Sequence, residues 1–215
     1  MKPLVENPLN LTEDDIFKPF SFEEFIQQIL KNCTLNPDST YSSEGNVNLS
    51  GLGLTILPVK FKEVKGDFNC SSNKLISLEG SPKKVGRTFW CDNNKLTSLK
   101  GASREVGKSF FCQYNNLTTL EGSPKKVSGN FWCSHNQLTT LKGAPEKVGR
   151  NFWCGNNRLT ALEGSPIKVG GEFSCNHNNL ATLEGASREV GRNFWCDSNP
   201  VSVYKLRKTI SRSYL

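Results

Sequence analysis

The chain has 215 residues, enough for one or two domains, and its 27 Lys and Arg against 20 Asp and Glu give a formal net charge of +7. No apolar run approaches the ~18 residues of a membrane span, and the first residues lack the apolar core of a secretory signal, so we expect a cytoplasmic protein. Eight cysteines without an export signal argue against a disulfide scaffold, and two histidines leave little material for His-based catalysis.

Residues 1–45 form an acidic N-terminal segment. They hold three lysines and eight carboxylates, whereas the remainder of the chain holds 24 basic and 12 acidic residues. Ser21-x-x-Glu24 is a capping box, and it precedes the apolar positions of an amphipathic helix, Phe25, Ile26, Ile29 and Leu30. We expect this segment to cap one end of the molecule; a contact with the basic surface is the alternative left open.

A period of 21 residues dominates residues 46–201. Seven cysteines keep this spacing: Cys70, Cys91, Cys112, Cys133, Cys154, Cys175 and Cys196. Phe stands two residues before each Cys, Asn three after it, and Val fifteen after the first six. A degenerate first copy fits the same columns with Val47, Leu49, Leu54, Leu57 and Val64. A fixed period of this length predicts a solenoid, here of eight strand-bearing units.

Each unit predicts one short strand. Phe and Cys alternate with a middle residue, so they face the interior while the middle residue faces outward. Glycines and prolines punctuate the return path, which favours an extended or irregular convex side without helices. The Asn column is expected to turn the chain inward and to satisfy backbone groups. Stacked units then form one core and one parallel sheet.

The unit Phe89-x-Cys91-x-x-Asn94-x-Leu96-x-x-Leu99 resembles the leucine-rich repeat, with Phe and Cys in place of the usual strand leucines. It is similar to short bacterial and phage repeats of the form F-x-C-x-x-N-x-L-x-x-L-x-G-x-P-x-x-V. The resemblance covers about three quarters of the chain and implies a leucine-rich-repeat solenoid with its parallel sheet on the concave face. It also implies a non-enzymatic scaffold for binding another protein.

The last segment, residues 202–215, carries Lys205, Arg207, Lys208 and Arg212 and no acidic residue, which suggests a basic C-terminal cap or tail. The regular cysteine column predicts free thiols buried in the core. Because no Cys-x-x-Cys pair exists and the column holds no His, we expect no metal site. We expect no cofactor and no catalytic residue.

The outward column of the strands carries the strongest functional signal. It reads Asn48, Asn69, Trp90, Phe111, Trp132, Trp153, Ser174 and Trp195, and so contains all four tryptophans. Self-stacking that shields the sheet is one interpretation. An interaction surface is the other, because large exposed aromatic patches and tryptophans mark binding sites. Asp92 and Tyr114 belong to the expected polar rim. A basic column, Arg87, Lys108, Arg150 and Arg192, is either a charged part of the interface or a solvated edge.

We therefore expect a protein-binding module whose partner-binding residues are Trp90, Phe111, Trp132, Trp153, Trp195, Tyr114, Asp92, Arg87, Lys108, Arg150 and Arg192. If the source is a phage or bacterium, inhibition of a host protein would be a natural use. The alternative is single-stranded nucleic-acid binding, by base stacking on the aromatic column beside the basic one. A second copy of the chain could also cover the aromatic column.

Overall fold

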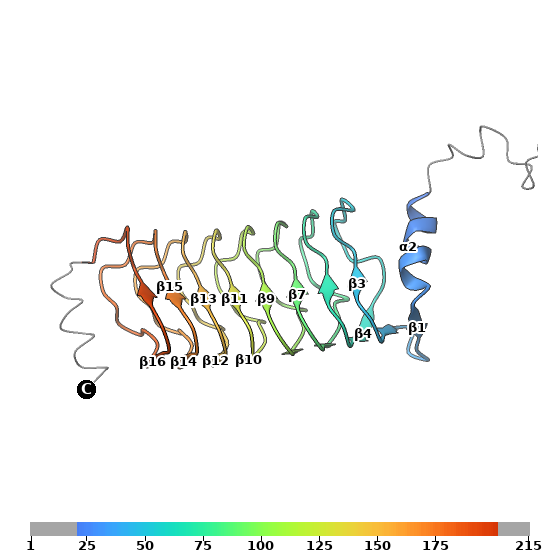
Figure 1. The fold of residues 1–215 in the computed structure, drawn as a ribbon. Coiled ribbons are helices and arrows are strands. Elements are labelled where there is room, and N and C mark those ends of the chain that lie inside the picture. The colour runs from blue at the N-terminus through green and yellow to red at the C-terminus, as the bar shows by residue number, and fades with distance from the viewer. Residues whose placement is uncertain (1–20, 202–215) are drawn as a thin grey trace, which may run out of the picture.

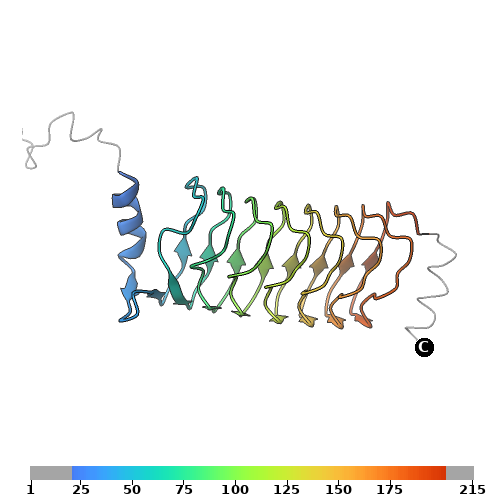
Figure 2. The same cartoon turned by 180° about the vertical axis from the view of Figure 1, so that it is seen from behind.

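The computed structural model of the chain describes residues 21–201. These residues form a solenoid of stacked units with a helix at one end (Figures 1 and 2). The expected basic cap, residues 202–215, lies outside the described residues, as do residues 1–20 of the acidic segment. The boundaries given above for the three segments therefore stay predictions.

The helix α2 spans Phe22–Leu30 and begins where the capping box predicts. The Glu24 backbone N–H donates to Ser21 Oγ at 3.2 Å, and the Ser21 backbone N–H donates to Glu24 Oε2 at 2.8 Å. Ile26 and Leu30 are buried in the core, whereas Phe25 is exposed. The helix thus covers the first rungs with a narrower apolar face than its sequence suggests.

The predicted parallel sheet is present and has eight strands. Each strand pairs in register with its neighbour 21 residues away, so Phe131 lies beside Phe110 and Phe152. Its strands are β3 (Val47–Asn48), β5 (Phe68–Asn69), β7 (Phe89–Trp90), β9 (Phe110–Phe111), β11 (Phe131–Trp132), β13 (Phe152–Trp153), β15 (Phe173–Ser174) and β17 (Phe194–Trp195). We call it the first sheet.

A second sheet, which the sequence analysis did not anticipate, runs along the lower edge of the stack in Figure 1. Its parallel strands are β2 (Tyr41–Ser43), β4 (Phe61–Val64), β6 (Lys84–Val85), β8 (Glu105–Val106), β10 (Lys126–Val127), β12 (Lys147–Val148), β14 (Lys168–Val169) and β16 (Glu189–Val190). Strand β1 (Cys33–Leu35) pairs antiparallel with β2. A bend of three residues separates the two strands of each unit, so every unit turns a corner between the sheets.

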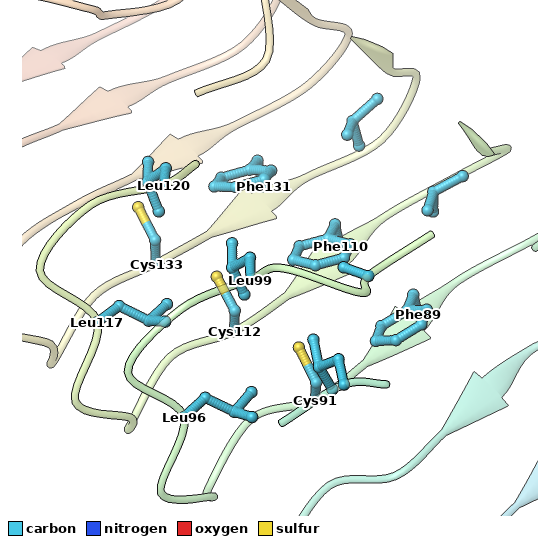
Figure 3. Close-up of a cluster of buried hydrophobic side chains, with 14 of the residues drawn as sticks. Phe89, Cys91, Leu96, Leu99, Phe110, Cys112, Leu117, Leu120, Phe131 and Cys133 are labelled. Atoms are coloured by element: carbon cyan, nitrogen blue, oxygen red, sulfur yellow. The ribbon is translucent and has the colours of Figure 1, made fainter. Parts of the chain in front are cut away.

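The core is a set of ladders, one for each apolar column (Figure 3). The Phe, Cys, Leu and Val columns are buried, and ring centroids of successive core phenylalanines lie 4.9–5.6 Å apart from Phe68 to Phe194. The return path from Cys91 to Arg104 holds bends and turns but no helix and no strand, as expected. This fold is a leucine-rich-repeat-like solenoid.

The asparagine column performs the expected backbone role. Asn115 Nδ2 donates to the carbonyls of Cys91, Cys112 and Gln113 at 3.0–3.3 Å, while its Oδ1 accepts from the Leu96 N–H at 3.0 Å. The same pattern repeats from Asn73 to Asn199. Each Asn therefore joins two units and satisfies groups that neither sheet reaches.

Candidate functional site

Four aromatic side chains form a continuous row on the outer face of the first sheet. We call Trp90, Phe111, Trp132 and Trp153 the aromatic stripe. Ring centroids are 5.9 Å apart for Trp90 and Phe111, 6.3 Å for Phe111 and Trp132, and 5.0 Å for Trp132 and Trp153. The last two pairs meet edge to face, an attractive geometry. Each ring is half-buried, because it covers part of its neighbour.

The sheet register limits the stripe at both ends. Asn69 lies beside Trp90 at one end, and Ser174 lies between Trp153 and Trp195 at the other. Trp195 is 44% exposed and stands apart from the other three tryptophans. The structure thus brings together four of the five aromatic residues that the sequence placed in one column.

Asp92 does not lie on an exposed rim, as the sequence analysis expected. It is only 9% exposed, beside the stripe, and its Oδ2 accepts from Asn93 Nδ2 at 2.9 Å. Its Oδ1 has no hydrogen-bond partner among the described residues. Burial raises the pKa of Asp92. The alternation argument placed this column at the edge, but the chain turns inward directly after Cys91 and takes the carboxyl with it.

Gln113 occupies the position of Asp92 one rung further along, and the sequence analysis did not single it out. It is 8% exposed, and its Oε1 also lacks a hydrogen-bond partner within the described part of the chain. Two buried acceptors therefore lie on adjacent rungs beside the stripe. Each unsatisfied buried acceptor costs about 1–3 kcal/mol, so the pair lowers the stability of the fold at this point.

Tyr114 lies in the left-handed turn that follows each strand. Its φ is +55°, a conformation that other units assign to Ser, Asn or His. Bulky residues rarely adopt it, so this tyrosine is strained. It is 47% exposed, and its ring stacks on that of His135 at a centroid distance of 4.4 Å. This exposed pair, of which only Tyr114 was predicted, forms an aromatic knob beside the stripe.

The four cations of the basic column are exposed and lie at the corner between the two sheets. We call Arg87, Lys108, Arg150 and Arg192 the basic edge. Arg87 Nε lies 3.7 Å from Asp67 Oδ1. Among the described residues, the other three have no carboxylate within ion-pair distance. The two columns that flank the stripe contain no Lys or Arg and hold four carboxylates, Asp67, Asp92, Glu172 and Asp197.

The cysteines are free thiols, and the six from Cys70 to Cys175 are buried. Burial raises their pKa values, and Sγ lies within hydrogen-bond range of a carbonyl on the next rung, as in Cys112 to Trp132 at 3.5 Å. Residues 21–201 contain no group of three or more His, Cys, Asp or Glu placed to hold a metal ion. They also contain no helix with the length and apolarity to cross a bilayer.

No protein-family model matches this chain, and no curated protein matches its sequence. Among solved structures, the chain is similar to YopM, a leucine-rich effector protein from Yersinia pestis, with a TM-score of 0.46 and 19% identity. The match covers 72% of this chain and 49% of the YopM chain, so this chain spans about half the length of that protein.

Proposed function

We propose that this solenoid is a non-enzymatic module that binds a partner protein on the aromatic stripe. The observation that carries the proposal is the continuous row of four half-buried aromatic rings on the outside of a rigid parallel sheet. Rings that are already packed against one another lose little entropy when a partner covers them. Tryptophan is also enriched among residues that dominate interface energies.

The negative charge of Asp92 beside the stripe indicates the chemistry of the partner. Asp92 Oδ1 and Gln113 Oε1 are buried beside Trp90 and Phe111 and accept no hydrogen bond within the described residues. These two oxygens have almost no accessible surface, so a partner would meet the negative charge of Asp92 without bonding to them. A lysine or arginine of the partner would be attracted to that charge and could lie over an indole ring. The matching surface is therefore apolar, with a cation opposite Asp92.

The charges around the stripe favour a protein over a single-stranded nucleic acid at this site. Stacking platforms for single strands combine aromatic rings with a positive groove. Here the columns that flank the rings hold carboxylates and no cation. A polyanion would meet Asp92 and Glu172 next to the aromatic rings, which is electrostatically unfavourable.

The test compares two triple variants with the native protein. Trp90→Ala/Trp132→Ala/Trp153→Ala removes the tryptophans of the stripe. Its control, Ile56→Ala/Ile76→Ala/Ile167→Ala, removes apolar side chains that are 66%, 63% and 51% exposed elsewhere. Circular dichroism first establishes that all three proteins fold. Nuclease-treated host lysate is then passed over each protein, and captured proteins are identified and titrated as purified species.

We expect one protein to bind the native chain and the isoleucine variant but not the tryptophan variant. Asp92→Asn, which keeps the shape of the side chain, should weaken that purified complex about tenfold or more by removing the negative charge beneath the partner's cation. Equal capture by all three proteins would contradict the proposal and return the stripe to a structural role. The finer hypothesis, a cytoplasmic phage or bacterial protein that inhibits a host protein, depends on the identity of the partner.

A further inference from the structure

Positive charge is concentrated at the second sheet, away from the aromatic stripe. Three columns of the repeat run along this part of the stack. They occupy the positions two residues before, one residue before and two residues after each buried Val. From Lys62 to Arg192 they hold thirteen cations and four carboxylates. The segregation is sharp, because the columns beside the stripe hold carboxylates and no cation.

The middle column contains a row of like charges in direct register. Lys126 lies opposite Lys147, and Lys147 lies opposite Lys168, on strands about 4.8 Å apart. We call these three residues the lysine ladder. Of these three lysines, only Lys168 has a carboxylate of the described residues within ion-pair distance. Its Nζ lies 2.7 Å from Glu189 Oε2. Like charges directly opposite one another destabilise a sheet.

The first rungs of the same column show that the fold also accepts alternating opposite charges at this position. At β4, β6 and β8 the outward residues are Glu63, Lys84 and Glu105, so opposite charges are paired. Lys84 Nζ lies 3.4 Å from Glu63 Oε1. The repeat therefore tolerates Glu at this position, and the lysine ladder lowers stability where alternation would raise it. A residue choice that works against stability points to a ligand.

A polar hollow adjoins the lysine ladder at the corner between the sheets. It has a volume of about 440 Å³ and lies between Arg150 and Arg192, where Gly171 supplies no side chain. Asn130 and Asn151 also line it. Their Oδ1 atoms accept the backbone N–H groups of Asn151 and Glu172, and their Nδ2 groups make no hydrogen bond within residues 21–201. No carboxylate lines this hollow.

Gly171 leaves the space between Arg150 and Arg192 open on its rung. A Cβ at this position would lie 3.0 Å from the Arg150 carbonyl oxygen and would clash with Asn151 Oδ1. The hollow is therefore open because this rung carries no side chain where Arg87, Lys108, Arg150 and Arg192 stand on other rungs. It presents two guanidinium groups and two side-chain amides, which are hydrogen-bond donors suited to a tetrahedral oxyanion.

We propose that the second sheet and the basic edge bind the phosphate backbone of a nucleic-acid duplex, with one phosphate in the hollow between Arg150 and Arg192. From Arg87 to Arg192 the basic edge spans five rung spacings, about 24 Å, or about seven base pairs of rise. The three columns contain no aromatic residue. They therefore offer cations for phosphates and no ring for unstacked bases, which favours a duplex over a single strand.

The experiment measures binding of a fluorescent 20-base-pair DNA duplex by anisotropy at several salt concentrations. Arg150→Ala/Arg192→Ala empties the hollow of its cations. Its control, Lys95→Ala/Arg158→Ala, removes two exposed cations that follow the first-sheet strands, at the other end of those strands from the basic edge. A second variant, Lys147→Glu, restores charge alternation, and Arg158→Glu matches its change in net charge.

We expect Arg150→Ala/Arg192→Ala to weaken duplex binding about tenfold or more and to reduce the salt slope by about two, while its control matches the native protein. Lys147→Glu should also weaken binding, yet melt at the same temperature or higher, which separates a lost contact from a lost fold. The tryptophan variant of the stripe should bind the duplex normally.

Three outcomes would overturn the proposal. Equal losses in the basic-edge and control variants would show attraction by net charge alone. A loss of duplex binding in the tryptophan variant would assign the nucleic acid to the stripe. Equal binding of poly-glutamate and duplex would show that the surface takes acidic polypeptides. None of these results depends on whether the stripe binds a protein, so the two proposals fail independently.

Discussion

At the scale of single residues, the asparagine column joins successive units through side-chain hydrogen bonds to the backbone. One amide satisfies three carbonyls and one N–H from two units, as Asn115 does. No other side chain combines two donors and an acceptor on so short a stem. The strict recurrence of Asn in the sequence follows from this geometry.

We predict that Asn115→Ala lowers the free energy of unfolding by about 2–4 kcal/mol, because buried backbone groups lose their partners. The matched control is Asn116→Ala, since Asn116 is exposed and only accepts from Gln137 Nε2 at 3.2 Å. Its cost should stay within about 0.5 kcal/mol. Urea unfolding of both variants checks the prediction, and equal costs would contradict it.

Asp92 gives the fold a pH dependence of known sign. Burial raises its pKa in the folded state, so the folded protein holds the proton more tightly than the unfolded chain does. Its contribution therefore favours folding below its unfolded pKa, about 3.9, and is lost as pH rises through the folded pKa. At neutral pH the buried, ionised carboxylate of Asp92 therefore lowers the free energy of unfolding.

We predict that Asp92→Asn becomes more stable relative to the native chain as pH rises from about 4 to about 7. Urea unfolding of both proteins across this range measures the difference. A difference that does not change with pH would show that the carboxyl ionises freely in the folded state. Together with weaker partner binding by the same variant, a stabilising effect at pH 7 would show that Asp92 serves recognition.

At the scale of elements, the helix cap is a separable unit. Ser21 and Glu24 exchange two hydrogen bonds at the start of α2, whose buried residues Ile26 and Leu30 join the core. Because this contact lies at one end of a stack, its loss affects neighbouring rungs first.

We predict that Ser21→Ala weakens α2 by about 0.5–2 kcal/mol. Amide hydrogen exchange should speed up in residues 22–30 and hardly change from β9 onward. Glu23→Ala is the control, because Glu23 lies in the same turn and takes no part in the capping box. Faster exchange throughout the molecule would mean that the helix and the whole stack unfold as one.

The elements differ in how far the sequence predicts them. The first sheet and α2 follow from patterns in the sequence, the Phe-x-Cys alternation repeated every 21 residues and the capping box. The second sheet does not, because Lys84–Val85 is too short to show an alternation and forms a strand only through pairing with β4 and β8. Its strands exist because neighbouring units repeat.

The candidate site, too, could be predicted only in part from the sequence. The column of tryptophans could be read from the 21-residue spacing, whereas the burial of Asp92 and Gln113 could not. Asp92 and Gln113 directly precede the left-handed residues Asn93 and Tyr114, where the chain leaves the strand, and the alternation of faces does not extend past that point. The sequence analysis did not single out the lysine ladder, because its like charges are recognised only from the register of β10, β12 and β14.

At the scale of the whole molecule, each unit contacts mainly its two neighbours, so stability is approximately a sum over units and interfaces. The structure carries two surfaces of different charge along one axis. One is the aromatic stripe, and the other is the second sheet with the basic edge. Because both run parallel to the stack, their lengths are set by the number of units.

We predict that deletion of residues 112–132, which is one period of 21 residues, leaves a folded solenoid. The deletion joins Phe111 to Cys133 and so restores the repeat motif. Circular dichroism should keep its shape, and both stability and the urea m-value should fall by about one unit's share. Deletion of residues 111–132 is the control, because it joins Phe110 directly to Cys133 so that the two side chains cannot both face the core, and it should lower stability more than the in-phase deletion does.

The most direct test of the central claim, that the stripe binds a protein, is photo-crosslinking in living cells that produce the protein. A benzophenone amino acid at Phe111, an aromatic position of the stripe, is compared with the same group at Ile167, which is 51% exposed elsewhere. We predict one discrete protein adduct from position 111 and none from position 167. Adducts of the same sizes from both positions, or none from position 111, would contradict the account.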